Sequence, residues 1–393
     1  MSLPHKGTSE ATRPARAERA AAASVTGIRR LDDELGATSP AQHVVFLHAV
    51  GPDATAFLMH AACATGRSVV YATTSRSPES FEAERKRMGF ASTPVVAVDL
   101  REVKDPSQAR KDIDDACQVL PDATLAIESL TGLVHAWGEA AAKAWFAALK
   151  DAWKGRRLLA SLADRAYEPG TRETFLGVDA VVRLARREVL GARHDVFQVV
   201  QAGGRAMTPR AFPFRVERPG GIRPHVSKIL VTGAYSAGKS TLVHTLSETG
   251  VNVEHLGTTV ALDHGRIDRD GLTIDLFGTP GQERFDPLIR QIGHGALGVL
   301  SVVDSARPST LHRARTLADE ISGGHVPVVY AANKQDAPGA LTPEAIRERL
   351  GIPAAVPVLA CRAHERESAV HVLDALVERV LATLAVPAAA TGS

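Results

Sequence analysis

A glycine-rich segment near the middle of the chain constrains the fold more than any other feature. Residues 233–240 read GAYSAGKS and satisfy the pattern G-x-x-x-x-G-K-[ST], between an apolar run, VSKILVT, and a segment of helical character, STLVHTLSET. In this order of strand, loop and helix, successive backbone amides and the helix N-terminus form a site for phosphate oxygens. The alternative is a glycine-rich turn without a ligand, which the flanking elements disfavour.

The loop supplies the first group of predicted ligand-binding residues. Lys239 is expected to reach the β and γ phosphates of a nucleotide, and the Ser240 hydroxyl to bind Mg²⁺. Cofactor contacts are predicted for the whole segment, which comprises Gly233, Ala234, Tyr235, Ser236, Ala237, Gly238, Lys239, Ser240 and Thr241.

A second segment follows directly after the apolar run LTIDLF. Residues 278–285 read GTPGQERF and resemble the second switch of Ras-like GTPases, whose usual form is D-x-x-G-Q-E. The resemblance implies that Gln282 is the catalytic residue that orients the attacking water, and that the Gly281 amide senses the γ-phosphate. A Gly/Pro turn that merely ends a strand is the alternative.

The tetrapeptide NKQD, Asn333 to Asp336, follows the apolar run VPVVYAA and resembles the guanine-reading motif of the Arf and Ras families. An aspartate can accept two hydrogen bonds from guanine, a pair of donors that adenine does not present. Asp336 is therefore the predicted specificity residue, with Asn333 bracing the loop and Lys334 lying along the base. Alone, the tetrapeptide also fits a solvated polar turn.

The segment between these motifs, LGTTVALDHGRI, extends the resemblance. Thr259 stands where the first switch supplies a threonine that binds Mg²⁺. Together with LFGTPGQERF, the segment resembles bacterial GTPases of conservon operons, which are related to the MglA polarity switches. The resemblance implies a Roadblock-type regulator and a GTP-dependent effector protein as partners, and a last loop around Cys361 and Arg362 that covers the guanine.

The second switch departs from the Ras pattern in its metal site. Gly278 stands where a magnesium-supporting aspartate is usual, and Asp275 is displaced by roughly 10 Å on the opposite strand face. Asp263 is an alternative anchor that would act through water. Tyr235 replaces a small residue of the phosphate loop and would crowd an incoming arginine. These departures predict hydrolysis at or below about 10⁻³ s⁻¹.

The first half of the chain alternates apolar and helical segments, which predicts a largely parallel α/β sheet. Its order of elements, and the stretch that ends in AFPFRVERPGGI, resemble the RecA-like domain of KaiC-type ATPases. At the expected phosphate loop, HAVGPDATAF, Asp53 and Ala54 replace a glycine and the lysine, which opposes phosphate binding. Of the acidic pair that would activate water in such an ATPase, only Glu128 remains, at the end of a strand. The segment is interpreted as a pseudo-ATPase.

The length of 393 residues predicts two domains. The expected organisation is a disordered tail (1–24), a degenerate RecA/KaiC-like domain (25–217), a linker (218–226), a Ras/Arf-like GTPase domain (227–385) and a second tail (386–393). The predicted fold class is α/β, with two P-loop-NTPase-like three-layer domains and mostly parallel sheets.

Charge and cysteine content set the remaining expectations. Forty-six basic and 44 acidic residues give no electrostatic reason to expect a nucleic acid partner. Three separated cysteines fit a reducing cytoplasm, and the N-terminal residues lack the apolar core of a signal peptide or membrane span.

Taken together, the motifs predict a GTP/GDP molecular switch that binds Mg²⁺ and hydrolyses GTP slowly. A nucleotide-binding scaffold without turnover is the main alternative. A RecA-type ATPase with a regulatory GTPase half is a further one, which the altered HAVGPDATAF loop disfavours.

Overall fold

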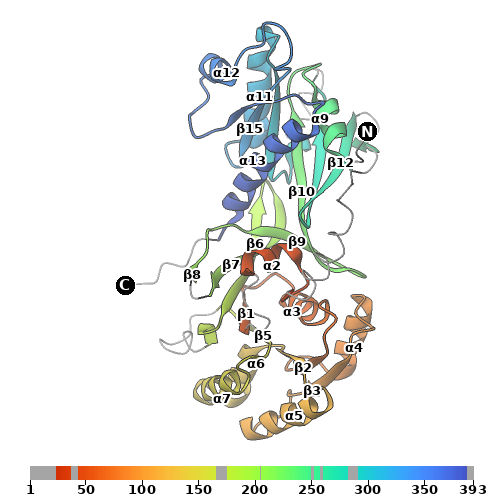
Figure 1. The fold of residues 1–393 in the computed structure, drawn as a ribbon, viewed down its shortest axis with the longest axis vertical. Coiled ribbons are helices and arrows are strands. Elements are labelled where there is room, and N and C mark those ends of the chain that lie inside the picture. Colours follow the sequence, from red (N-terminus) through yellow and green to blue (C-terminus); the bar gives the residue numbers. More distant parts are fainter. Residues whose placement is uncertain are drawn as a thin grey trace, which may run out of the picture. The chain divides into compact units, whose positions relative to one another are not determined.

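The computed structural model describes residues 24–36, 43–164, 175–203, 205–248, 252–256, 260–281 and 291–386 (Figure 1). The chain divides into two compact units. The N-terminal unit comprises Met1–Leu184, Val199–Met207 and Val216–Ile222. The C-terminal unit comprises Ala185–Gln198, Thr208–Arg215 and Arg223–Ser393. The expected tails, and the predicted residues Thr259 and Gln282, lie wholly or almost wholly outside the described residues.

The N-terminal unit is built on a parallel sheet with the strand order β3-β2-β4-β5-β1-β6. Its strands are β1 (His43–His48), β2 (Val69–Thr73), β3 (Val95–Asp99), β4 (Thr124–Ile127), β5 (Leu158–Ala163) and β6 (Ala180–Val189). Its helices are α2 (Arg29–Leu35), α3 (Ala54–Cys63), α4 (Pro78–Arg87), α5 (Pro106–Val119), α6 (Leu130–Trp137) and α7 (Glu139–Ala152) (Figure 1).

Both faces of this sheet are covered, which explains why its strands are continuous apolar runs rather than alternating ones. On one face, residues of α5, α6 and α7 such as Ile113 and Phe146 join a single buried cluster with strand residues such as Leu125. Elsewhere in the core, aromatic rings pair strand to helix: Tyr71 of β2 stacks on Phe81 of α4 with ring centroids 4.1 Å apart. The predicted parallel α/β fold is confirmed.

Strands β7 (Ala192–Ala202), β8 (Arg205–Ala206) and β9 (Phe212–Glu217) follow, with β7 antiparallel to β8 and β9. Residues 218–220 then form a turn, and β10 runs from Gly221 to Thr232. The predicted linker, residues 218–226, thus overlaps the start of β10. The ladder from β10 to β13 begins at His225, one residue after Pro224, so the proline lies outside that ladder.

The C-terminal unit contains a second mostly parallel sheet, with the strand order β11-β12-β13-β10-β14-β15-β16. Only β12 runs antiparallel to its two neighbours. Besides β10, the strands are β11 (Asn252–Leu256), β12 (Val260–Arg269), β13 (Leu272–Gly278), β14 (Gly298–Asp304), β15 (Val328–Asn333) and β16 (Val358–Ala360).

Helices cover this sheet as well. They are α9 (Lys239–Leu246), α11 (Leu311–Ser322), α12 (Pro343–Leu350) and α13 (Arg366–Leu384), with a short 3-10 helix at Pro308–Thr310. Helix α11 packs against β14, α12 against β16, and α13 against β14, β15 and α9 (Figure 1). Parallel strands that share a sheet end at the same edge, so the loops after β10, β14 and β15 meet there.

No helix within the described ranges is both long enough and apolar enough to span a bilayer.

Candidate nucleotide site

The loop between β10 and α9 requires glycine at both ends of its motif. Gly233 has φ +140°, and a Cβ atom there would lie 2.1 Å from the carbonyl oxygen of Val302 on β14. Gly238 has φ +105°, and its Cβ would lie 2.3 Å from Nδ2 of Asn333. The two glycines thus let the loop pass close to β14 and to the loop after β15.

The loop presents donors without internal partners. Among the described residues, no hydrogen-bond acceptor engages the backbone amides of Ser236, Gly238, Lys239 or Ser240. The Lys239 ammonium donates to the Ala234 carbonyl at 2.9 Å. Burial lowers the pKa of Lys239 to about 8, and the carboxylate of Asp263 opposes this shift. Free amides and a poorly solvated ammonium together favour an anion in this loop.

Asn333, the last residue of β15, connects three segments. Its Nδ2 donates to the Ala237 carbonyl of the phosphate loop at 2.8 Å, and its Oδ1 accepts from the Ala363 amide at 2.8 Å. Both bonds are buried, and the side chain is 3% exposed. The predicted bracing role of Asn333 thus has a concrete form: it ties the phosphate loop to the loop after β16.

Lys334 lies over the phosphate loop in a left-handed backbone conformation, with φ +64°. Its ammonium pairs with the buried Asp304 at 2.6 Å and donates to the Ser236 carbonyl at 3.0 Å. Asp304 ends β14, and the sequence analysis did not single it out. In the sequence, Asp304 is marked only as a carboxylate at the end of an apolar strand.

These segments enclose a cavity of about 200 Å³, formed by the phosphate loop, the NKQD segment and the loop after β16. Its lining residues are Gly238, Thr241, Asn333, Lys334, Asp336, Ala337, Ala363 and His364. Asp336 therefore lies beside a space next to the phosphate loop, as the sequence leads one to expect of a residue that reads a base.

The loop after β16 lines the cavity through residues other than Cys361 and Arg362. Ala363 and His364 line the cavity, whereas Cys361 is buried and Arg362 pairs with Glu365 at 3.0 Å. Burial raises the pKa of Cys361 to about 11, which keeps it a neutral thiol. Ala363 carries no chemical signal in the sequence, because its contribution is a backbone amide bound to Asn333.

The start of the second switch lies against the phosphate loop. A Cβ atom on Gly281 would lie 2.7 Å from both Lys239 Nζ and the Tyr235 amide nitrogen. Only a glycine leaves its backbone this close to the loop. Tyr235 itself is 65% exposed, so its ring extends away from the core.

Two carboxylates near this edge have different surroundings. Asp263 on β12 pairs in register with Gly278 on β13, and its Oδ2 lies 3.4 Å from the place of a Cβ on Gly278. Asp275 instead binds His225 at 2.8 Å and Arg266 at 2.6 Å. Burial opposes ionisation of Asp275, but the hydrogen bonds from His225 and Arg266 outweigh it and hold its pKa well below the usual value.

The corresponding loop of the N-terminal unit is occupied by its own side chains. The Asp53 carboxylate accepts from the Ala56 amide at 2.8 Å, capping α3, and pairs with Arg218 at 3.2 Å. Glu128 is 2% exposed, accepts from the Thr74 and Ser75 amides at 2.8 Å and pairs with Arg76 at 2.6 Å. A cavity of about 240 Å³ here is lined by Asp53, Ala56, Arg76, Glu84, Arg87 and Arg218.

Comparison with known proteins separates the two halves of the chain. Residues 222–380 match the profile of the ADP-ribosylation factor family, and residues 23–206 match that of a family of unknown function (DUF7125). ADP-ribosylation factor-like protein 4D of Mus musculus is 34% identical over 137 residues, covering 32% of this chain and 65% of the relative.

Two further relatives are similar over parts of their length. ADP-ribosylation factor-like protein 8b of Arabidopsis thaliana is 29% identical over 32% of this chain and 70% of the relative. An uncharacterized protein of Methanocaldococcus jannaschii is 35% identical over 21% of this chain and 54% of the relative. The chain thus spans just under two thirds of the mouse protein's length. Residues 222–380, which bring the phosphate loop and the NKQD segment around one cavity, thus resemble the small GTPase domain of the ADP-ribosylation factor family.

Proposed function

We propose that this protein is a guanine-nucleotide switch whose C-terminal unit binds GDP and GTP with Mg²⁺. The supporting observation is that Asn333 joins the phosphate loop to the loop after β16, and that Asp336 lines the cavity beside them. Asp336 accepts the two donors of guanine, Lys334 lies along the base, and Lys239 with the loop amides binds the phosphates. The similarity of residues 222–380 to the ADP-ribosylation factor family supports the same assignment.

Asp336→Asn tests the base assignment. Replacing one carboxylate oxygen by an amide puts a donor against a donor of guanine, so GDP affinity should fall roughly 100-fold. Displacement of a fluorescent GDP analogue by GDP, GTP and ATP measures this. Lys239→Ala serves as a comparison that weakens phosphate binding for every nucleotide. Equal displacement by ATP and GTP in the unmodified protein would refute guanine specificity.

The residues around the phosphate loop fit a hydrated Mg²⁺ ion. The Ser240 side chain is exposed at the start of α9, and the Asp263 carboxylate lies beside Gly278 and close enough to Lys239 to influence its charge. When bound, Mg²⁺ neutralises charge on the phosphates. We assign Ser240 and Thr259 as ligands, and Asp263 as the anchor that replaces the missing aspartate through a water molecule.

Hydrolysis is proposed to be slow and to depend on Gln282. Gly278 stands where a metal-anchoring carboxylate is usual, and Tyr235, with its exposed ring, stands in the phosphate loop where a small residue would leave room for an inserted arginine. Single-turnover hydrolysis by the protein alone should proceed at about 10⁻³ s⁻¹ or less, and Gln282→Leu should lower it further. A fast rate, or one indifferent to Gln282→Leu, would contradict this mechanism.

A scaffold that holds nucleotide without turnover is the second candidate, and the glycine at position 278 favours it. Under that function GTP would remain intact over many hours on the purified protein, with or without a partner. Stimulation of hydrolysis by a Roadblock-type regulator, or by any GTP-dependent partner recovered in a pull-down, would instead favour the switch.

The N-terminal unit is proposed to be a pseudo-ATPase that regulates the switch or relays its state. In support, Asp53 caps α3 where phosphate would bind, and Ala54 stands where a lysine is expected. A RecA-type ATPase requires that this unit bind Mg·ATP.

A further inference from the structure

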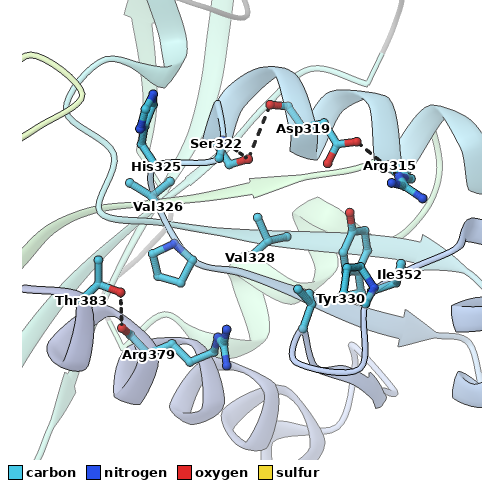
Figure 2. Close-up of a pocket in the computed structure, with 14 residues that line it drawn as sticks. Arg315, Asp319, Ser322, His325, Val326, Val328, Tyr330, Ile352, Arg379 and Thr383 are labelled. Carbon is cyan, nitrogen blue, oxygen red and sulfur yellow. Dashed lines mark hydrogen bonds and ion pairs between the residues drawn. The ribbon is translucent and has the colours of Figure 1, made fainter.

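A second cavity, of about 480 Å³, lies in the C-terminal unit at the start of β15 (Figure 2). Helix α11, residues 322–328, the loop after α12 and the end of α13 form its walls. The nucleotide cavity lies at the other end of β15, beyond Asn333. Asn333 lies five positions after Val328 along the strand, which corresponds to roughly 17 Å. The two sites can therefore be filled at the same time.

One side of the cavity is apolar and continuous with the core. Val326, Tyr330 and Ile352 are 6% exposed or less and belong to the buried cluster under α11 and α12, with Val328 and Val356 packed against it. In Figure 2, Val328 lies at the centre of the cavity between α11 and α13. A ligand resting here would cover the edge of an existing hydrophobic core.

The charges around the cavity do not balance. Arg315 pairs with Asp319 along α11 at 3.3 Å. Arg379 of α13 has no acidic partner among the described residues, and its Nε is buried without a hydrogen-bond acceptor. Figure 2 shows Arg379 across the cavity from that pair, on the α13 side. The Arg379 side chain is half-buried and has no carboxylate beside it among the described residues, so an anion placed against its guanidinium would gain a charge-assisted bond.

Tyr330 adds a neutral polar group to the same wall. Burial raises the pKa of its phenol to about 12, and the Asp319 carboxylate adds to this shift while Arg315 opposes it. The phenol therefore stays protonated at neutral pH and can donate a hydrogen bond. The cavity thus combines one unpaired cation, one neutral donor and an apolar floor.

We propose that this cavity is a binding site for a small amphipathic carboxylate, an aliphatic or aromatic acid with one charged head and an apolar body. The head lies against Arg379, and the body covers Val328, Ile352 and Val356. The volume suits such a ligand, because small-molecule sites commonly measure about 300–1,000 Å³. Guanine nucleotide does not suit this cavity, because its several phosphate charges would face a single unpaired cation.

The test uses the full-length protein, saturated with Mg·GDP where it binds that nucleotide, and three probes: octanoate, octan-1-ol and acetate. Calorimetry and ligand-observed NMR measure each affinity. Octanoate should bind at least about tenfold more tightly than octan-1-ol, because only the carboxylate engages Arg379. Acetate, which lacks the apolar body, should bind more weakly than octanoate.

Matched variants locate the binding. Arg379→Gln should remove the preference for octanoate over octan-1-ol while retaining the weaker apolar affinity. Arg349→Gln removes the same charge from an exposed position on α12 outside the cavity and should leave octanoate binding unchanged. Val328→Ser should weaken octanoate and octan-1-ol alike.

Three results would overturn the proposal. They are equal affinity for octanoate and octan-1-ol, an octanoate affinity that Arg379→Gln leaves unchanged, and no octanoate binding at millimolar concentration. If Arg379→Gln fails to fold, chemical-shift changes of the unmodified protein decide the question: perturbations confined to the cavity walls, which are α11, residues 322–330, residues 352–356 and the end of α13, support the site. Perturbations elsewhere refute it. Neither readout depends on nucleotide binding.

Discussion

At the scale of single residues, the two cavities of the C-terminal unit depend on side chains whose roles follow from the groups that they contact. Asn333 is an ordinary polar residue in the sequence, yet both of its side-chain atoms bind backbone groups of other loops. Asp263 and Asp275 are both strand aspartates, but one lies beside Gly278 and the other binds His225 and Arg266. Their different partners predict different roles.

If Asp263 anchors Mg²⁺, a carboxylate at the paired position 278 on β13 should be able to take over this role. Asp263→Ala should raise the Mg²⁺ concentration needed to retain GDP by about tenfold, the effect of losing one charge-assisted bond. The swap Asp263→Ala/Gly278→Asp moves a carboxylate to the paired position on β13 and should restore retention. GDP release measured over a Mg²⁺ titration reports both. Unchanged Mg²⁺ dependence in Asp263→Ala would exclude this residue as the anchor.

At the scale of elements, the loop after β15 determines whether the nucleotide cavity forms. Asn333→Ala would leave the Ala237 carbonyl and the Ala363 amide buried without partners, costing about 2–4 kcal/mol of unfolding free energy. We expect GDP affinity to fall at least tenfold as well, because the phosphate loop and the last loop are no longer joined. Urea denaturation and GDP titration give the two values.

Gln335→Ala is the matched control in the same loop. Its amide binds Ser305 and Leu341, on the side away from the phosphate loop. It should lower stability by about 1 kcal/mol with little change in GDP affinity. Equal losses of affinity in both variants would show that the loop acts as a whole, rather than through the bond that Asn333 makes.

At the scale of the whole molecule, the two units should differ in ligand response. Mg·GDP at 100 times its dissociation constant should stabilise the C-terminal unit by about 2.7 kcal/mol. Millimolar Mg·ATP should produce no stabilisation, because Asp53 and Arg218 occupy the loop before α3. Thermal unfolding of the full chain measures both responses. Lys239→Ala should remove the GDP effect, and an ATP effect that survives in this variant would contradict the pseudo-ATPase assignment.

The sequence by itself determined the fold class and the motif residues. Continuous apolar runs indicate parallel strands covered on both faces, and the loop of residues 233–240 specifies its own flanking elements. Local patterns of this kind need no knowledge of distant residues. They also predicted Asp336 and Asn333 by type, before any neighbour was known.

The tertiary structure decided what depends on contacts between distant segments. The strand at Gly221–Thr232 begins at a glycine and contains Pro224, which argue against it locally, but pairing with β13 stabilises it. Ala363 reaches the site through a backbone amide, and Asp304 through an ion pair with Lys334. The unpaired charge of Arg379 became visible only when α11, α13 and β15 were brought together. Backbone donors and unmatched charges carry no signature in a linear sequence, because every residue other than proline has a backbone N–H group and most surface arginines are solvated.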